Sequence, residues 1–163
     1  MHRVENRIRV IPDFPKPGIL FRDITPVLLD PDALTIGVSA LADPFRTQEI
    51  THVAGMEARG FIFGSLVARE LGVGFVPLRK PGKLPHDVER VDYALEYGQA
   101  GLEVHSDAVR DGDRVLIVDD LLATGGTAQA ACHLIEKLGA EVIACAFLIE
   151  LSGLGGNEKI HPV

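Results

Sequence analysis

The sequence predicts an α/β fold in which a parallel, twisted sheet is flanked by helices. From residue 50 onward, short apolar runs rich in Val and Ile alternate with helical patterns. Such alternation is typical of parallel sheets that are covered on both faces. The chain has 163 residues, of which 47% are hydrophobic and 24% are charged, and this balance suits one domain with its own core. We therefore expect a single domain over residues 1–163.

The N-terminal segment, residues 1–30, does not fit this alternation. Residues 1–10 are expected to form a short helix, because their apolar side chains recur at helical spacing. Residues 11–26 hold four prolines and a glycine, which predict an irregular segment with a short strand at residues 19–21. Since a segment of this kind often covers the ligand end of a sheet, we expect an irregular N-terminal hood.

Helices and strands alternate through the middle of the chain. Asp30 precedes a helix that has Pro31 at its first position and runs to about Ala42. Apolar periodicity then predicts, in chain order, a strand at residues 50–54, a helix at 60–71 and a strand at 73–78.

The next segment has a different character. Residues 79–91 contain two prolines and a glycine and show no apolar periodicity, so we expect a mobile loop. Residues 93–97 and 102–104 could pair as a hairpin around the intervening glycines. Together, residues 79–98 are expected to form a flexible loop that leads into a hairpin.

The C-terminal third is predicted to contain strand, helix and strand. Residues 114–118 read as a buried strand, and the following helix ends at Gly139. Residues 141–151 form the expected last strand. We interpret the later glycines, Gly153, Gly155 and Gly156, as a plain surface turn.

Composition excludes several classes of protein. No apolar run approaches the roughly eighteen residues of a membrane span, and the N-terminus lacks the apolar stretch of a secretory signal, so we expect a cytoplasmic protein without a membrane partner. Cys132 and Cys145 are expected to be small core residues of a reduced protein. The net charge of −7 disfavours a nucleic-acid partner and requires local cations for any anionic ligand.

Residues 115–131, VLIVDDLLATGGTAQAA, are the most informative stretch. Asp119 and Asp120 follow a buried apolar run, at the end of the sheet where open parallel sheets bind ligands. Paired acids there can accept sugar hydroxyls or support a hydrated cation. The alternative is that one acid caps the next helix and the other is favoured by its dipole.

The loop after these acids is suited to a phosphate. Its glycines allow close backbone approach, two threonine hydroxyls can donate, and the helix N-terminus that follows attracts anions. The spacing matches neither a Walker A motif nor a dinucleotide fingerprint. We therefore predict a ribose-phosphate site, with the phosphate held by Ala123, Thr124, Gly125, Gly126 and Thr127.

Three further groups of residues are candidates. Arg59 lies between two glycines where a strand meets a helix, and its fork could bind an anion; the alternative is a surface arginine beside a capping Glu57. Arg79, Lys80 and Lys83 form a basic cluster that could capture a leaving group, or else a solvated charge run. The third group lies in the hood and the hairpin and comprises Leu20, Phe21, Arg22 and Glu96.

Phe21 in the hood could be a core residue or could stack on a flat heterocycle, with Leu20 and Arg22 beside it. Glu96 in the hairpin is the weakest candidate, the alternative being that it faces solvent on a strand. Composition alone does not choose between these interpretations.

These motifs together resemble a known family. VLIVDDLLATGGT is similar to the phosphoribosyl pyrophosphate motif of the type I phosphoribosyltransferases. Four other stretches resemble the adenine-specific branch, and the resemblance runs in order over nearly the whole chain. They are IPDFPKPGILFRDITPVL at residues 11–28, GMEARGFIFG at 55–64, LRKPGKLP at 78–85 and YALEYG at 93–98.

The resemblance implies a Mg²⁺-dependent transfer in purine salvage. Adenine N9 would attack the anomeric carbon of phosphoribosyl pyrophosphate, giving AMP and pyrophosphate with inversion. The metal would be held mainly by the substrate, with no direct protein cage, and the enzyme would be a homodimer. The alternatives are a phosphoribosyltransferase for another base and a non-catalytic regulator that senses phosphoribosyl pyrophosphate.

The resemblance also implies residue roles. The loop from Ala123 to Thr127 would bind the 5′-phosphate, and Asp119 and Asp120 would serve the ribose hydroxyls and the metal-bound substrate. Residues 79–91 would be a flexible catalytic loop that excludes water from the site. The remaining roles would be pyrophosphate binding by Arg59, Arg79, Lys80 and Lys83, adenine binding by Leu20, Phe21, Arg22 and Leu121, and catalysis by Arg59 and Glu96.

Overall fold

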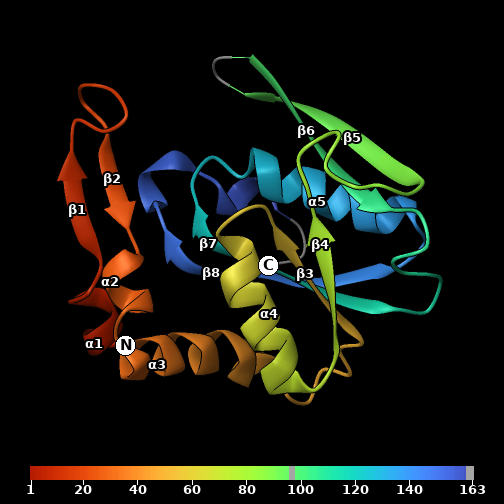
Figure 1. The fold of residues 1–163 in the computed structure, drawn as a ribbon, viewed down its shortest axis with the longest axis horizontal. Helices are drawn as coiled ribbons and strands as arrows, with labels where there is room; N and C mark the ends of the chain where they lie inside the picture. The colour runs from red at the N-terminus through yellow and green to blue at the C-terminus, as the bar shows by residue number, and fades with distance from the viewer. Residues whose placement is uncertain (96–97, 161–163) are drawn as a thin grey trace.

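The computed structural model describes residues 1–95 and 98–160, and its centre is a four-stranded parallel sheet (Figure 1). The strands lie in the order β4–β3–β7–β8, which confirms the predicted parallel sheet. β3 and β7 occupy the centre, where parallel strands are buried on both faces. The strands are β3 (His52–Met56), β4 (Gly74–Leu78), β7 (Arg114–Leu122) and β8 (Glu141–Glu150).

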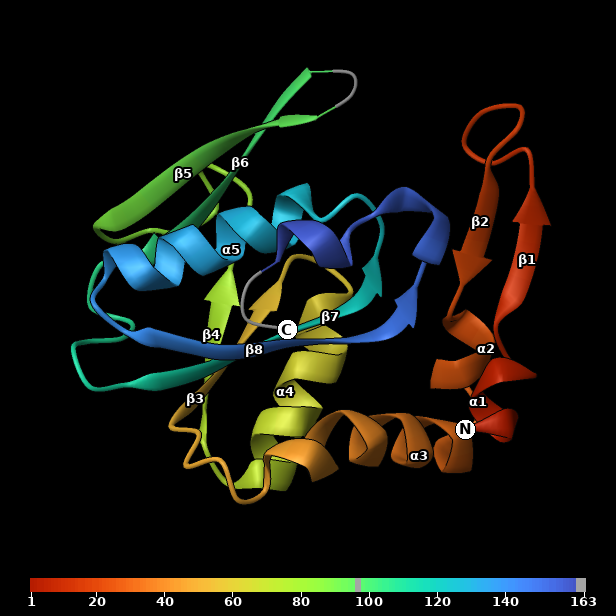
Figure 2. The same ribbon diagram turned by 180° about the vertical axis from the view of Figure 1, so that it is seen from behind.

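Alternate side chains of the central strands form two apolar layers. Leu116 and Val118 pack under α3 (Pro31–Ala42) and α4 (Gly60–Leu71), whereas Val115 and Ile117 pack on the side of α5 (Gly126–Lys137). Figures 1 and 2 show α4 and α5 on opposite faces of the sheet. Since each strand side chain points to the face opposite its neighbour's, the sheet separates two cores.

The three long helices agree with the prediction. The carboxylate of Asp30 accepts the N–H groups of Asp32 and Ala33, and Pro31 opens α3. Arg3 donates to Asp30 at 2.9 and 3.2 Å, and this hydrogen bonding lowers the pKa of the buried carboxyl to about 2. The same contacts tie the hood to α3. Short 3₁₀ turns occur at η1 (Asp43–Phe45), η2 (Ser152–Leu154) and η3 (Asn157–Lys159).

The hood differs from the prediction at its start. Helix α1 (His2–Glu5) is shorter than the expected helix over residues 1–10. The chain instead enters β1 (Arg9–Pro12), because β2 (Leu20–Asp23) provides an antiparallel partner for its backbone. Helix α2 (Thr25–Leu28) follows. In Figures 1 and 2 the β1–β2 ribbon stands at one side of the sheet end.

The hairpin also begins earlier than predicted. β5 (Val88–Leu95) pairs antiparallel with β6 (Gly98–His105), so residues 88–91 are strand rather than loop. Val91 and Tyr93 pack against the core on the α5 side, and Glu89 forms an ion pair with Lys137 of α5 at 2.6 Å. These inward contacts stabilise residues 88–91 as a strand, although the charges of this segment suggested a loop. The mobility expected of residues 79–87 stays a prediction.

The two cysteines lie in the buried core. The Sγ atoms of Cys132 and Cys145 lie 3.5 Å apart, and both thiols are free and buried, as expected of core residues. Within the described part of the chain, no helix is long and apolar enough to cross a membrane.

Candidate active site

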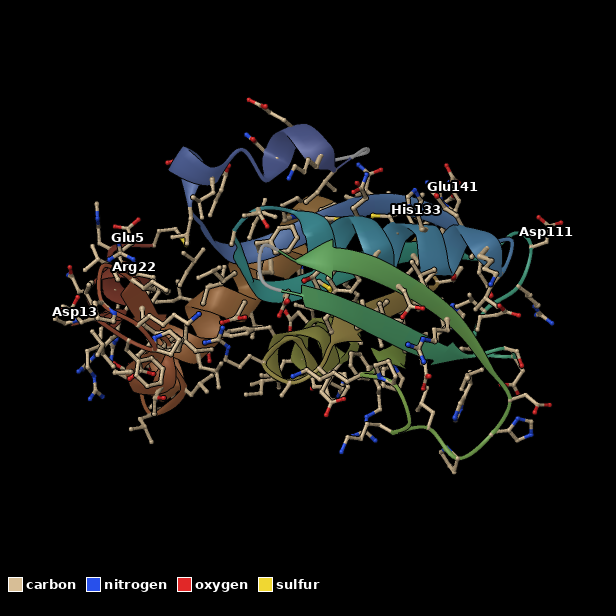
Figure 3. The ribbon with its side chains drawn as sticks, turned by 90° about the horizontal axis from the view of Figure 1, so that it is seen from above. Glu5, Asp13, Arg22, Asp111, His133 and Glu141 are labelled. Atoms are coloured by element: carbon tan, nitrogen blue, oxygen red, sulfur yellow. The ribbon has the colours of Figure 1, made fainter. Side chains whose placement is uncertain are left out.

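The predicted site residues that the structure describes lie around the carboxyl ends of β3 and β7. The β3–α4 connection carries Arg59, and the β7–α5 connection carries the phosphate loop, which we define as residues 123–127. Figure 3 shows Arg22 on the hood at one side of this end of the sheet and the β5–β6 hairpin over the other side. The segments that sequence reasoning selected thus surround one place.

A hollow of about 210 Å³ lies over the start of α5. It is lined by all five residues of the phosphate loop together with Asp119 and Leu121. Gly125 has a left-handed backbone, with φ of +80°, and no side chain caps the helix that it opens. The amides at this helix start therefore have no side-chain acceptor in the described structure, which suits an anion.

The two acids differ in their surroundings because β7 extends to Leu122, past the strand end expected at Val118. Within a strand, neighbouring side chains point to opposite faces. Asp120 is only 2% exposed, whereas Asp119 is half-buried and lines the hollow. The Oδ1 atom of Asp119 also accepts the N–H of Asp120 at 2.8 Å.

Burial changes the acidity of both groups. Desolvation, with the neighbouring negative charge of Asp120, raises the pKa of Asp119 to about 7. Desolvation also raises the pKa of Asp120, but the Arg59 guanidinium opposes this shift. The ion pair makes Asp120 the better place for a negative charge, and Asp119 is the acid that changes protonation near neutral pH.

Arg59 joins three parts of the site. Its Nε lies 3.0 Å from Oδ2 of Asp120, in an ion pair without hydrogen-bond alignment, since that oxygen is buried and has no hydrogen-bond partner in the described structure. Its guanidinium carbon lies 5.4 Å from the centroid of the Phe21 ring. Gly60 follows, and a Cβ there would come 2.8 Å from Oδ1 of Asp119, so α4 starts directly against the acids.

Phe21 is not a core residue. It is half-buried on the ribbon, forms an edge-to-face contact with Phe14 at 5.1 Å, and belongs to none of the apolar clusters. Leu20 beside it is 55% exposed. Leu121 lines the hollow on β7, whereas Arg22 lies on the ribbon. Sequence reasoning missed Phe14, for which the only signal is its place among the prolines.

The basic loop, defined here as residues 79–83, is held by Glu57. The guanidinium of Arg79 donates to both oxygens of Glu57 at 3.3 Å and to the carbonyl of Lys83 at 3.0 Å. The N–H of Lys80 donates to Glu57 at 3.1 Å. The hydrogen bond from Arg79 lowers the pKa of Glu57 most, and the hydrogen bond from the Lys80 N–H lowers it further. Glu57 therefore binds this loop and forms no helix cap.

Lys80 shares a hollow with one residue of the phosphate loop. It lines a hollow of about 460 Å³ together with Thr127, and the hydroxyl of Tyr93 lies 3.2 Å from Oγ1 of Thr127 within the same region. Sequence reasoning missed Tyr93, because a contact between a hairpin and a distant loop leaves no local signal. Glu96 lies outside the described residues, and its role stays a prediction.

The glycine turn after β8 is not a plain surface turn, and that prediction is wrong for Gly156. This residue is buried against the phosphate loop, where a Cβ would overlap the carbonyl oxygen of Ala123. Conversely, a Cβ added to Gly125 would come 2.6 Å from the carbonyl oxygen of Gly156. Gly153 is exposed with open space around it, as expected of a surface position.

Comparison with known proteins agrees with this geometry. A sequence profile of the phosphoribosyl transferase domain family matches residues 28–162. An adenine phosphoribosyltransferase of Methylococcus capsulatus is 67% identical over 161 residues, covering 99% of this chain and 94% of that protein. The chain belongs to the adenine phosphoribosyltransferase family.

Solved adenine phosphoribosyltransferases have the same fold. The crystal structure from Rhodothermus marinus superposes with a TM-score of 0.94 at 53% identity, covering 99% of this chain and 92% of that one. The enzyme from Saccharomyces cerevisiae, solved in complex with an imino-altritol bisphosphate and adenine, gives 0.93 at 39% identity and covers 98% and 93%. The adenine-specific branch of the family is thereby confirmed.

Proposed function

We propose that this protein transfers the phosphoribosyl group of phosphoribosyl pyrophosphate to adenine, forming AMP and pyrophosphate in purine salvage. The observation that carries the proposal is the hollow at the end of β7, which is lined by the whole phosphate loop, Asp119 and Leu121. The names of the relatives support it, as does the adenine present in the Saccharomyces cerevisiae structure.

The 5′-phosphate is assigned to residues 123–127. Backbone N–H groups at the start of α5 and the positive end of its dipole favour a dianion there. The hydroxyls of Thr124 and Thr127 can donate to the remaining phosphate oxygens. Because Gly125 and Gly156 meet without side chains, the loop keeps a tight backbone that fits around a small anion.

Asp119 and Asp120 are assigned to the ribose hydroxyls. A carboxylate accepts hydroxyl protons well, and the raised pKa of Asp119 lets it also donate when protonated. The donor set fits a hydrated Mg²⁺ held mainly by the substrate, since Asp119 lines the hollow and Mg²⁺ prefers carboxylate oxygens while it keeps several of its waters. When bound, Mg²⁺ would neutralise pyrophosphate charge.

Pyrophosphate is assigned to Arg59, Arg79, Lys80 and Lys83. Negative charge grows on the leaving pyrophosphate as its bond to the anomeric carbon breaks, and fixed cations stabilise that charge more strongly where water is excluded. Lys80 has no hydrogen bond or ion pair through its ammonium in the described chain, which leaves this charge available.

Adenine is assigned to the space between the hood and β7. Phe21 and Leu121 would contact the two faces of the ring, and Leu20 and Arg22 would lie at its edge. We assign proton transfer with the purine imidazole to Glu96. A cytoplasmic homodimer remains part of the proposal, and sedimentation of the purified protein tests its oligomeric state.

The deciding experiment mixes the protein with Mg²⁺, phosphoribosyl pyrophosphate and one base at a time. AMP is expected from adenine. Turnover of hypoxanthine or xanthine in place of adenine would overturn the proposed base. Tight binding of phosphoribosyl pyrophosphate without turnover of any base would instead favour a regulator that senses this ligand.

A further inference from the structure

Glu103 is a buried acid for which the roles above give no use. Three charged residues are buried in the described structure: Asp30, Glu103 and Asp120. Asp30 caps α3 and Asp120 pairs with Arg59, but Glu103 lies on β6, away from both, and is 6% exposed. A buried carboxylate is costly unless its oxygens are hydrogen-bonded or paired. The partners of the Glu103 carboxylate therefore indicate its role.

Those partners belong to the basic loop. Oε2 of Glu103 accepts the N–H of Gly82 at 2.8 Å. The backbones of Glu103 and Arg79 exchange two hydrogen bonds, at 2.7 and 2.8 Å, and so join the start of this loop to β6. The nearest cation, Arg90, is 3.9 Å away, is half-exposed and pairs more closely with Asp92 at 2.7 Å. Gly82 is thus the main partner of the Glu103 side chain.

Gly101 is a second residue of β6 that contacts the basic loop; we call Gly101 and Glu103 together the seat of this loop. Gly101 lies two residues before Glu103, on the same face of the strand. A Cβ at Gly101 would come 2.7 Å from Oδ1 of Asp92 on β5 and 3.0 Å from Cγ of Pro81, so the loop also packs on the strand backbone at this point. Gly82 itself has a φ of +77°, which lets the chain turn so that its N–H meets the carboxylate.

The loop is therefore fixed from two sides. Glu57 holds the Arg79 side chain and the Lys80 N–H, and Glu103 holds Gly82. Lys80 lies between these contacts and lines the hollow that Thr127 also lines. The two acids fix the backbone, and the Lys80 ammonium group forms no hydrogen bond or ion pair in the described structure.

We propose that Glu103 is a positioning residue, which seats the basic loop on β6 so that Lys80 faces the pyrophosphate. This inference rests on the proposed role of the loop cations in pyrophosphate binding. Glu103 does not touch the substrate. Its effect reaches the reaction only through the place at which it holds residues 79–83.

The test compares Glu103→Ala and Glu103→Gln with the matched control Glu89→Gln. Glu89 is an acid of the same hairpin that pairs with Lys137 instead of the loop. Glu103→Ala should raise the KM for phosphoribosyl pyrophosphate and the inhibition constant of pyrophosphate about tenfold, about 1.4 kcal/mol of binding, and leave the KM for adenine nearly unchanged. Glu103→Gln should retain most of the affinity, because its amide oxygen can still accept the Gly82 N–H. Unchanged constants in Glu103→Ala, or equal changes in Glu89→Gln, would overturn the inference.

A Lys80→Ala variant separates this inference from the proposed function. If Lys80→Ala leaves pyrophosphate inhibition unchanged, the assigned role of Lys80 fails and the inference fails with it. If Lys80→Ala weakens pyrophosphate binding but Glu103→Ala does not, only the inference fails. The expected result is that Glu103→Ala adds little in the Lys80→Ala background. Should Glu103→Ala not fold, Gly101→Ala tests the same contact by displacing Pro81, with Asp92→Ala as the control for the carboxylate that the added methyl group also meets. Unchanged constants in Gly101→Ala, or equal changes in Asp92→Ala, would overturn the inference.

Discussion

The guanidinium of Arg59 and the carboxylate of Asp120 form an ion pair of 3.0 Å at the junction of β7 and α4. The pair joins the residue assigned to the leaving group and one of the acids assigned to the ribose. It is also half buried, because the Asp120 side chain is 3% exposed and that of Arg59 is 40% exposed. Changes at either residue should therefore affect both chemistry and folding.

Arg59→Ala is expected to lower kcat by about tenfold or more, because a charge-stabilising donor is lost. It should also lower the free energy of unfolding, since Asp120 would stay buried without its cation. Steady-state kinetics and urea unfolding measure the two effects. The control is Arg69→Ala, an exposed arginine on the same helix. Near-normal turnover in Arg59→Ala would contradict its role.

Asp119→Asn is expected to stabilise the free protein at neutral and higher pH while lowering its activity. The folded-state pKa of Asp119 is raised from 3.8 to about 7, so the unfolded chain loses this proton first as the pH rises. The wild type should thus lose stability between about pH 4 and pH 7, and the asparagine variant should not lose this contribution. Urea unfolding at pH 5 and pH 8 provides the comparison. A variant that is less stable than the wild type at pH 8 would contradict the raised pKa.

Gly156→Ala is expected to raise the KM for phosphoribosyl pyrophosphate severalfold, because the added methyl group would push the Ala123 carbonyl and shift the phosphate loop. Kinetics with varied phosphoribosyl pyrophosphate and fixed adenine measure this effect. Gly153→Ala is the matched control in the same turn, since nothing lies within 4 Å of its added methyl group. Equal behaviour of the two variants would show that contact with the loop has no effect on binding.

Phe21→Ala is expected to raise the KM for adenine and leave the KM for phosphoribosyl pyrophosphate almost unchanged. The reason is that its ring lies on the hood, beside Arg59 and apart from the apolar clusters. Val10→Ala, an exposed change on the neighbouring strand, provides the control. A change in the KM for phosphoribosyl pyrophosphate alone would contradict the assignment of Phe21 to the adenine site.

Local patterns were sufficient to predict the sheet and the two connections that form the site. A run of apolar residues followed by Asp119, Asp120 and a glycine loop specifies a strand, its end and a helix start within one stretch of chain. The same holds for Arg59 between its glycines. Such features depend on neighbours in sequence, which a single sequence displays.

The features that were missed depend on distant partners. The segment from Val88 contains charges at Glu89, Arg90 and Asp92, and it is a strand because Glu89 meets Lys137 and Val91 meets the core. Gly156 is buried only because the phosphate loop lies against it. Glu57 was considered only as a helix cap and Glu103 was given no role, because the basic loop that both acids bind is distant from them in the sequence.

The extension of β7 through both acids gives each carboxylate its own face. Asp120 follows the alternation of Leu116 and Val118, on the side of α4, and Asp119 follows Val115 and Ile117, on the side of α5. The odd or even position along this strand therefore decides which acid meets Arg59 and which lines the hollow. Insertion of one residue between the apolar run and Asp119 should exchange these two environments while keeping the composition of the motif, so the length of this stretch matters as well as its residue types.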